Sequence, residues 1–145
     1  MDLSQQAHVL VVANRTAATP ALAEAVRNRA ALGPATFHLL VPDPAMPDWH
    51  PHHTLTMANH VLELSIPILD EAAGAQITGS VSSRRDPMDA IEEILREQDF
   101  DEIILSTLPR SISRWLHLDL PRRVASLGLP LTTIIAVERA ASLSR

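Results

Sequence analysis

Four short hydrophobic runs stand out along the chain, each rich in valine, isoleucine and leucine. Continuous runs of this length are typical of strands that are buried on both faces, as in parallel sheets. A fifth, weaker run alternates with polar residues, which is typical of a strand at a sheet edge. In chain order, the five predicted strands are 8–13, 36–41, 76–81, 102–107 and 131–136.

Two of the stretches between these strands carry helix-start signals. Thr19 followed by Pro20 offers a side-chain cap and then a proline in the first turn, and Gly33 ends the same helix. Asp86 followed by Pro87 repeats the signal ahead of the fourth strand. Hydrophobic residues at helical spacing follow both signals, so each stretch is predicted to form an amphipathic helix.

The two other connections are less regular. Residues 42–53 hold four prolines and are predicted to form the longest loop. A helix is predicted over 55–74, but Pro67 inside it removes a backbone donor and should kink or interrupt that helix. The last connection has leucine and valine at helical spacing over 116–127, which predicts a further helical segment.

Strands that alternate with helices need crossover connections, and crossovers of one hand place helices on both faces of a parallel sheet. We therefore predict an α/β fold with a single, doubly wound, five-stranded parallel sheet. A chain of 145 residues, 46% of them hydrophobic, suits one domain with one sizeable core. We assign residues 1–139 to this domain and residues 140–145 to a flexible C-terminal tail.

Composition narrows the class of partner. The 12 basic residues against 17 acidic ones give a net charge of -5, which disfavours nucleic acid and anionic membranes. The chain has no cysteine, no basic leader and no hydrophobic run long enough for a membrane span. We therefore expect a cytoplasmic protein that does not insert into membranes.

The candidate ligand site follows from the predicted topology, because α/β sheets bind ligands beyond the carboxyl ends of their strands. After the fourth strand, arginines and serines surround a predicted helix start, where free N–H groups and the helix dipole favour an anion such as phosphate. The polar residues after the first two strands are of types that bind ribose or base edges. Structural alternatives stay open for all of them, namely a helix cap, ion pairs and turns. The candidate residues are Asn14, Asp43, Arg110, Ser111, Ser113 and Arg114.

Histidines gather in and after the proline-rich loop, at His50, His52, His53 and His60. Imidazole is a common metal ligand. Adjacent histidines in an irregular loop have no fixed ligand geometry, however, and no cysteine completes a ligand set, so we predict no native metal site. Whether Trp49 in the same loop packs inward is left open by the sequence.

No arrangement of residues specifies a catalytic reaction. The chain has no G-x-S-x-G nucleophile elbow, no P-loop and no G-x-G-x-x-G fingerprint, and no carboxylate pair is spaced for acid–base chemistry. We therefore expect a binding protein in preference to an enzyme.

The strand–helix order, the run from Val9 to Asn14 and the segment from Phe100 to Val124 resemble the universal stress protein family. The resemblance covers nearly the whole chain and implies a five-stranded parallel sheet of the adenine nucleotide alpha hydrolase-like type. It also implies a homodimer formed through the last strand, residues 131–136. In one branch of the family, ATP is bound by the motif G-x2-G-x9-G-[ST] after the fourth strand.

This chain lacks the glycines of that motif, so the resemblance is to a divergent branch of the family. Pro109 and Ser111 stand near the first glycines, and Leu118-Asp119 replaces the final Gly-Ser. Glycines let the backbone approach phosphates closely, so their loss predicts that ATP does not bind in the usual family manner. Asp119 also adds negative charge near the implied γ-phosphate position, and Asn14 stands where ATP-binding members carry an aspartate.

The resemblance therefore implies a regulatory or ligand-sensing module that binds a small anionic or nucleotide ligand, or no ligand. We expect no bound cofactor, with ATP and AMP as the alternatives that stay open. Two alternatives stay open. One is a nucleotide-binding or nucleotide-hydrolysing enzyme with an arginine-based phosphate site, and the other is a protein-interaction module whose cleft is vestigial.

Overall fold

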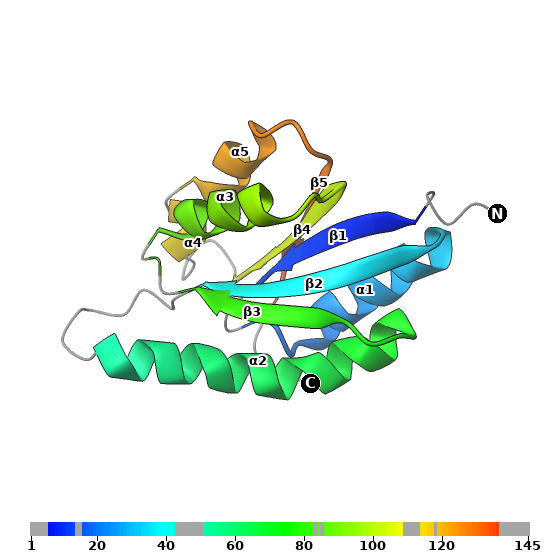
Figure 1. Cartoon of the computed structure of the whole chain (residues 1–145), viewed down its shortest axis with the longest axis horizontal. Helices are drawn as coiled ribbons and strands as arrows, with labels where there is room; N and C mark the ends of the chain where they lie inside the picture. The colour runs from blue at the N-terminus through cyan, green and yellow to red at the C-terminus, as the bar shows by residue number, and fades with distance from the viewer. Residues whose placement is uncertain are drawn as a thin grey trace, which may run out of the picture.

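The computed structural model describes residues 6–13, 16–42, 51–82, 84, 86–108, 114–117 and 119–136, with the backbone alone at 51–57, 114 and 117. In this part of the chain a parallel sheet lies between helices on both of its faces (Figure 1). The elements are β1 (Ala7–Val12), α1 (Pro20–Leu32), β2 (Ala35–Pro42), α2 (Pro51–Ala73), β3 (Thr78–Ser82), α3 (Pro87–Glu97), β4 (Glu102–Thr107), α4 (Arg114–His117), α5 (Leu120–Ala125) and β5 (Leu131–Ile135).

The strands are all parallel and lie in the order β3-β2-β1-β4-β5. The chain builds outward from β1 to β3, crosses back to β4, and then builds outward to β5. Because parallel crossovers are right-handed, the two directions place α1 and α2 on one face and α3, α4 and α5 on the other (Figure 1). The predicted doubly wound sheet is confirmed, including the edge position of the weak third strand.

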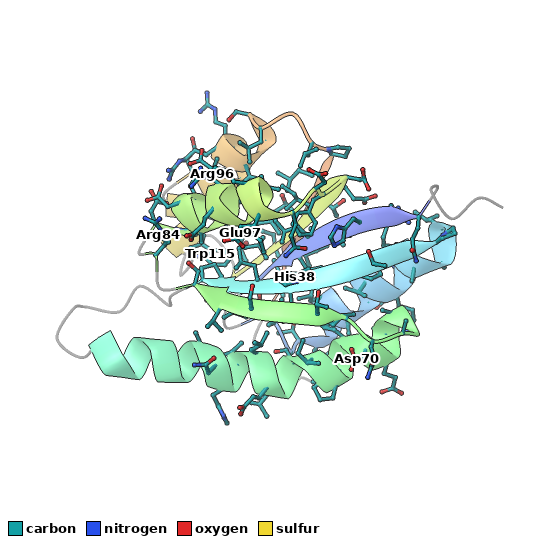
Figure 2. The ribbon with its side chains drawn as sticks, in the orientation of Figure 1. His38, Asp70, Arg84, Arg96, Glu97 and Trp115 are labelled. Carbon is teal, nitrogen blue, oxygen red and sulfur yellow. The ribbon has the colours of Figure 1, made fainter. Side chains whose placement is uncertain are left out.

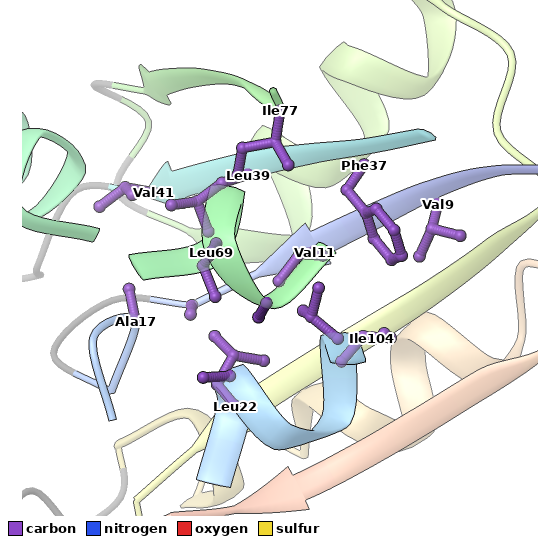
Figure 3. Close-up of a cluster of buried hydrophobic side chains, with 14 of the residues drawn as sticks. Val9, Val11, Ala17, Leu22, Phe37, Leu39, Val41, Leu69, Ile77 and Ile104 are labelled. Carbon is purple, nitrogen blue, oxygen red and sulfur yellow. The ribbon is translucent and has the colours of Figure 1, made fainter. Parts of the chain in front are cut away.

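Burial on both faces explains the continuous hydrophobic runs of the inner strands. On one face, Val11 of β1 and Leu39 of β2 pack against Leu22 of α1 and Leu69 of α2 (Figure 3). The residues between them, such as Leu10, point to the opposite face and pack in a second cluster with α3, α4 and α5. Each inner strand thus contributes hydrophobic side chains to two separate layers of core.

The helix-start signals act as predicted. The side chain of Thr19 accepts the Leu22 N–H at 3.4 Å, and that of Asp86 accepts the Met88 N–H at 2.9 Å. Asp86 also accepts a hydrogen bond of 3.0 Å from Arg123, which ties α3 to α5. Desolvation alone would raise the pKa of Asp86, but the hydrogen bonds from Arg123 and Met88 and the charge of Arg123 hold that pKa below its usual value.

The interruption expected at Pro67 does not occur, because α2 runs through this residue as one helix. Pro67 and Glu63 are both exposed, so water is available to the Glu63 carbonyl that loses its intrahelical donor. The buried stripe of α2 lies on the other side and keeps its contacts with the sheet. Neither α2 nor any other helix in the described residues is long and apolar enough to cross a membrane.

The last connection forms two short helices in place of the single helical segment that was expected. Asp119 lies between α4 and α5 in the left-handed conformation, with φ of 61°, and this turns the chain between the two helices. Leu120 and Val124 of α5 are fully buried, so the predicted apolar face is confirmed there.

Side chains as well as the backbone ladder hold β3 at the sheet edge. The ring of His38 in β2 bonds two hydroxyl groups of β3, with 2.6 Å from Nδ1 to Thr78 Oγ1 and 2.9 Å from Nε2 to Ser80 Oγ. His38 is buried in the middle of β2 (Figure 2), with the Phe100 ring 6.2 Å away. Burial lowers the pKa of His38, and the nearby charge of His8 lowers it further.

We expect His38 to make the fold less stable in mild acid. Its pKa is lower in the folded than in the unfolded chain, so its contribution is complete above the unfolded value of about 6.5 and is lost as the pH falls through the folded value. Denaturant unfolding at about pH 7.5 and about pH 5.5 should show a larger loss of unfolding free energy for the wild type than for His38→Gln. His60→Gln, which changes an exposed histidine of α2, should follow the wild type. Equal losses for the wild type and His38→Gln would contradict this role.

α2 packs on β3 closely enough that a side chain at Gly79 would displace the ends of two α2 side chains. A Cβ atom there would lie 2.7 Å from Leu62 Cδ1 and 2.9 Å from Ile66 Cδ1. We expect Gly79→Ala to lower the free energy of unfolding by about 1 kcal/mol, the low end of the range for overpacking, because the ends of these two side chains can shift. In a Leu62→Ala background the same substitution should cost less, because the nearer contact is gone. An equal cost in both backgrounds, measured by denaturant unfolding, would argue against close packing.

Candidate functional site

β1 and β4 lie side by side in the middle of the sheet, paired in register from Val9↔Glu102 to Val12↔Leu105. The chain after β1 leads to β2 on one side, and the chain after β4 leads to β5 on the other. The two connections therefore separate at the carboxyl ends of these strands. Switch points of this kind form the crevice in which open α/β sheets bind their ligands.

Two buried hydroxyl groups meet at this switch point. Thr16 lies in the turn after β1, Ser106 lies near the end of β4, and a hydrogen bond of 2.6 Å joins Thr16 Oγ1 to Ser106 Oγ. Their exposed fractions are only 2% and 1%, so the pair fixes the turn to β4 from inside the fold. Neither residue was among the predicted site residues. The available signal was a pair of hydroxyl residues, Ser106 and Thr107, at the end of an otherwise apolar run.

The predicted ligand residues lie outside the described residues, except for the backbone of one arginine. The strands that precede them, β1, β2 and β4, are parallel neighbours, so the chain leaves all three at the same edge of the sheet. How the side chains meet there stays a prediction. The residues outside the described part are Asn14, Asp43, Arg110, Ser111 and Ser113, and Arg114 is the first residue of α4.

α4 attaches the segment after β4 to the core. This helix has four residues, and its Trp115 is buried in the cluster on the α3 face (Figure 2). The helix start predicted near Ser113 agrees with the first residue of α4. The segment that carries the candidate phosphate residues therefore runs between two anchored elements, the end of β4 and Trp115.

Several described arginines are already paired with carboxylates and belong to the scaffold. The four pairs lie on different elements of the fold. Each arginine faces a carboxylate, so together they do not form a single positive patch. None of these four arginines is among the predicted anion-site residues, and the assignment of Arg110 and Arg114 to that site stays a prediction. The pairs, with their N–O distances, are Arg29–Glu102 at 2.9 Å, Arg84–Glu93 at 3.4 Å, Arg122–Asp119 at 3.4 Å and Arg123–Asp86 at 3.0 Å.

The histidine-rich segment adds no cluster of metal ligands to the described residues. Trp49 and His50 lie outside these residues, and only the backbone of His52 and His53 is described, in the first turn of α2. His60 is exposed on the same helix. Among the side chains that the structure describes, no three histidine, aspartate or glutamate residues gather closely enough to hold a metal ion.

The helices leave one edge strand uncovered on each face of the sheet. Strands lie about 4.8 Å apart and packed helices about 10 Å apart, so two helices side by side cover about four strands. On the face of α1 and α2, a groove of about 450 Å³ opens between α1 and β5. On the opposite face, a groove of about 290 Å³ opens between α3 and β3.

These two grooves differ in chemistry. Ile134 lines the α1–β5 groove together with Leu32, which is 81% exposed, and Ile135 on the same strand is 53% exposed. The α3–β3 groove is lined on its strand side by hydroxyl groups, including Ser80 and Ser82. Large exposed hydrophobic side chains favour a protein partner, whereas hydroxyl groups are well solvated. The β5 edge is therefore the better candidate for a protein interface.

Three solved structures are similar in fold to this chain. The structure of a universal stress protein from Archaeoglobus fulgidus has a TM-score of 0.64 at 16% identity and covers 88% of this chain and 93% of that chain. The universal stress protein from the same organism in complex with dAMP has a TM-score of 0.58 at 17% identity, covering 89% and 97%. A protein from the universal stress protein family from Burkholderia pseudomallei has a TM-score of 0.52 at 18% identity, covering 90% and 96%.

No protein-family model matches the sequence, and no curated protein matches it. With identities of 16–18%, the likeness to the three solved structures concerns the fold. The expectation drawn from the sequence is confirmed at that level: this chain has the fold of the universal stress proteins.

Proposed function

We propose that this protein is a universal-stress-protein-like regulatory module that senses an adenine nucleotide at the switch point between β1 and β4. The observation that supports it most directly is the reversal of strand order between β1 and β4, in a fold of which one solved example is in complex with dAMP. The absence of a catalytic motif in the sequence supports sensing over turnover. A cytoplasmic setting is part of the proposal and fits a chain without cysteine.

The phosphate group is assigned to the segment between β4 and α4. Arg110 and Arg114 would hold its charge through paired N–H groups, and Ser111 and Ser113 would add hydroxyl donors. Asn14 and Asp43, which follow β1 and β2, are assigned to the ribose and the base. The parallel neighbours β2, β1 and β4 support this division, because they bring all three segments to one edge of the sheet.

A monophosphate fits this chain better than a triphosphate. Universal stress proteins that bind ATP use a glycine-rich loop, and this chain has Pro109, Ser111 and Leu118-Asp119 in its place. Asp119 is 60% exposed, and its contact with Arg122 is 3.4 Å long, so its charge is only partly offset. A carboxylate near the end of a triphosphate chain would repel it.

We expect AMP to stabilise the fold and ATP to do so less at the same concentration. A ligand at about 100 times its dissociation constant adds ~2.7 kcal/mol to the free energy of unfolding, or roughly 5–10 °C in the melting temperature of a chain of this size. A thermal-shift titration with AMP, ATP and inorganic phosphate measures the effect. Arg110→Ala should lose most of the AMP shift, while Arg27→Ala, at an exposed position of α1, should keep it.

The outcomes separate the alternatives. No shift with any nucleotide or with phosphate would overturn the sensing role and favour a protein-interaction module. Sustained ATP hydrolysis that disappears in Arg110→Ala would favour an enzyme with an arginine-based phosphate site.

Homodimerisation through residues 131–136 is the second part of the proposal, and the α1–β5 groove supports it. The groove is mainly apolar and lies beside the free edge of β5. Pro130 O accepts from the Ile103 N–H at 2.9 Å, and the Ala136 N–H donates to Thr107 O at 2.8 Å. Because alternate residues of a parallel strand bond to the same neighbour, Thr133 directs its N–H and C=O to the free edge.

We expect the wild type to form a dimer of twice 15.8 kDa and Thr133→Pro to be monomeric. Proline at this position removes a donor on the free edge without breaking the ladder with β4. Size-exclusion chromatography with light scattering gives the mass, and Thr133→Val, which keeps the N–H, should remain dimeric. Ile135→Lys, which adds a charge beside the same edge, should also give a monomer. A monomeric wild type, or a Thr133→Pro protein that still dimerises, would count against this interface.

A further inference from the structure

The hydrogen bond between Thr16 and Ser106 joins segments 90 positions apart at the switch point. Thr16 Oγ1 and Ser106 Oγ are 2.6 Å apart, which is short for two neutral hydroxyl groups. Ala17 and Ile104 beside them in the chain are buried and apolar. Within the described part of the chain, neither hydroxyl group bonds to any other side chain. A buried hydroxyl group without a partner is costly, so each holds the other in place.

The turn that carries Thr16 is fixed on both sides of residues 14–15. Before them, the Ala13 N–H donates to Leu40 O at 3.2 Å, which extends the ladder between β1 and β2. After them, Thr16 O accepts the Thr19 N–H at 3.1 Å and the Thr19 hydroxyl at 2.8 Å. Thr19 is also the N-cap of α1. The Thr16–Ser106 bond therefore connects the start of α1 to the end of β4.

The end of β4 is an equally firm anchor. Ser106 is followed by Thr107, whose carbonyl accepts the Ala136 N–H at 2.8 Å and whose hydroxyl donates to Leu108 O at 3.1 Å. Ser106 itself lies within the ladder with β5, opposite Ile134. Movement of Thr16 away from β4 thus requires breaking its bond to a residue that the sheet holds rigidly.

We propose that the Thr16–Ser106 pair is a positioning clasp for the nucleotide site. It holds the turn after β1 against the end of β4, at the edge of the sheet where the proposed site lies. The inference rests on the proposed nucleotide site. Neither hydroxyl group contacts the ligand, since both are buried and bonded to each other. The pair keeps the crevice formed before the ligand arrives, which spares the ligand the entropy cost of ordering the turn.

The test removes the bond while keeping the shape of the side chains. Thr16→Val and Ser106→Ala each delete one hydroxyl group, and isothermal titration with AMP measures the affinity. Each variant should bind AMP roughly three- to tenfold more weakly, as the loss of one hydrogen bond predicts. The double variant should be no weaker than the single ones, because all three lack the same bond. Thr16→Ser, which keeps a hydroxyl group, should retain the wild-type affinity.

Hydrogen exchange gives a second measurement that needs no ligand. The amides of Thr19 and Ala23, which bond to the carbonyls of Thr16 and Thr19, should exchange faster in Thr16→Val and Ser106→Ala. Thr78→Val is the matched control, because it deletes a hydroxyl group that bonds to His38 on the other face of the sheet. It should leave both the AMP affinity and the exchange of these amides unchanged.

The outcomes distinguish the clasp from the proposed function. Unchanged exchange in Thr16→Val and Ser106→Ala would overturn the clasp, whatever the ligand. Faster exchange with unchanged AMP affinity would show that the bond stabilises the turn without positioning the site, and would also overturn it. If the wild type binds no nucleotide, the proposed function fails and with it the positioning role, while the exchange data show separately whether the bond holds the turn.

Discussion

The parallel pairing of β1 with β4 is the contact on which the rest of the structure depends. It brings together two strands whose connections leave in opposite directions, and this reversal places helices on both faces of the sheet. In open α/β sheets, such a reversal is the place where ligands bind. The pairing requires both strands to be buried on both faces, which explains the continuous hydrophobic runs from Val9 to Val12 and from Ile103 to Leu105. The hydroxyl groups of Thr16 and Ser106 interrupt that pattern only where the two strands end, and there they bond to each other.

The width of the sheet sets a second constraint, because its helices cannot cover every strand on both faces. The sequence meets this constraint differently at the two edges. At β3, Thr78 and Ser80 bond to His38, and Ser80 and Ser82 line an open groove, so this edge is compatible with water. At β5, Ile134 lines an apolar groove at the free edge of the sheet, and Ile135 on the same strand is exposed. This asymmetry is an argument for a protein partner at β5 that does not depend on likeness to other proteins.

Much of this fold could be predicted from local patterns, because those patterns report on burial and helix ends. The run 102–107 is a strand with the predicted bounds, and Thr19 and Asp86 cap helices as expected. The helix is not interrupted at Pro67, since the effect of a proline depends on whether water can reach the carbonyl it leaves free, and this depends on which face of α2 packs on the sheet. The Thr16–Ser106 and His38–Ser80 contacts follow from strand order, which the hydrophobic pattern alone leaves undetermined.

The loss of the glycine motif and the presence of the hydroxyl clasp are connected by the entropy of binding. A glycine-rich loop binds phosphate with backbone N–H groups, whereas a site built from Arg110 and Arg114 must order long side chains, which opposes binding. Such a site gains most from a frame that is fixed before the ligand arrives, because the ligand then has only the side chains to order. A turn held to β4 by Thr16 and Ser106, and a following segment held to the core by Trp115, supply a frame of this kind. The bonded turn after β1 and the anchored α4 therefore make the proposed arginine-based nucleotide site physically reasonable in a chain without the glycines.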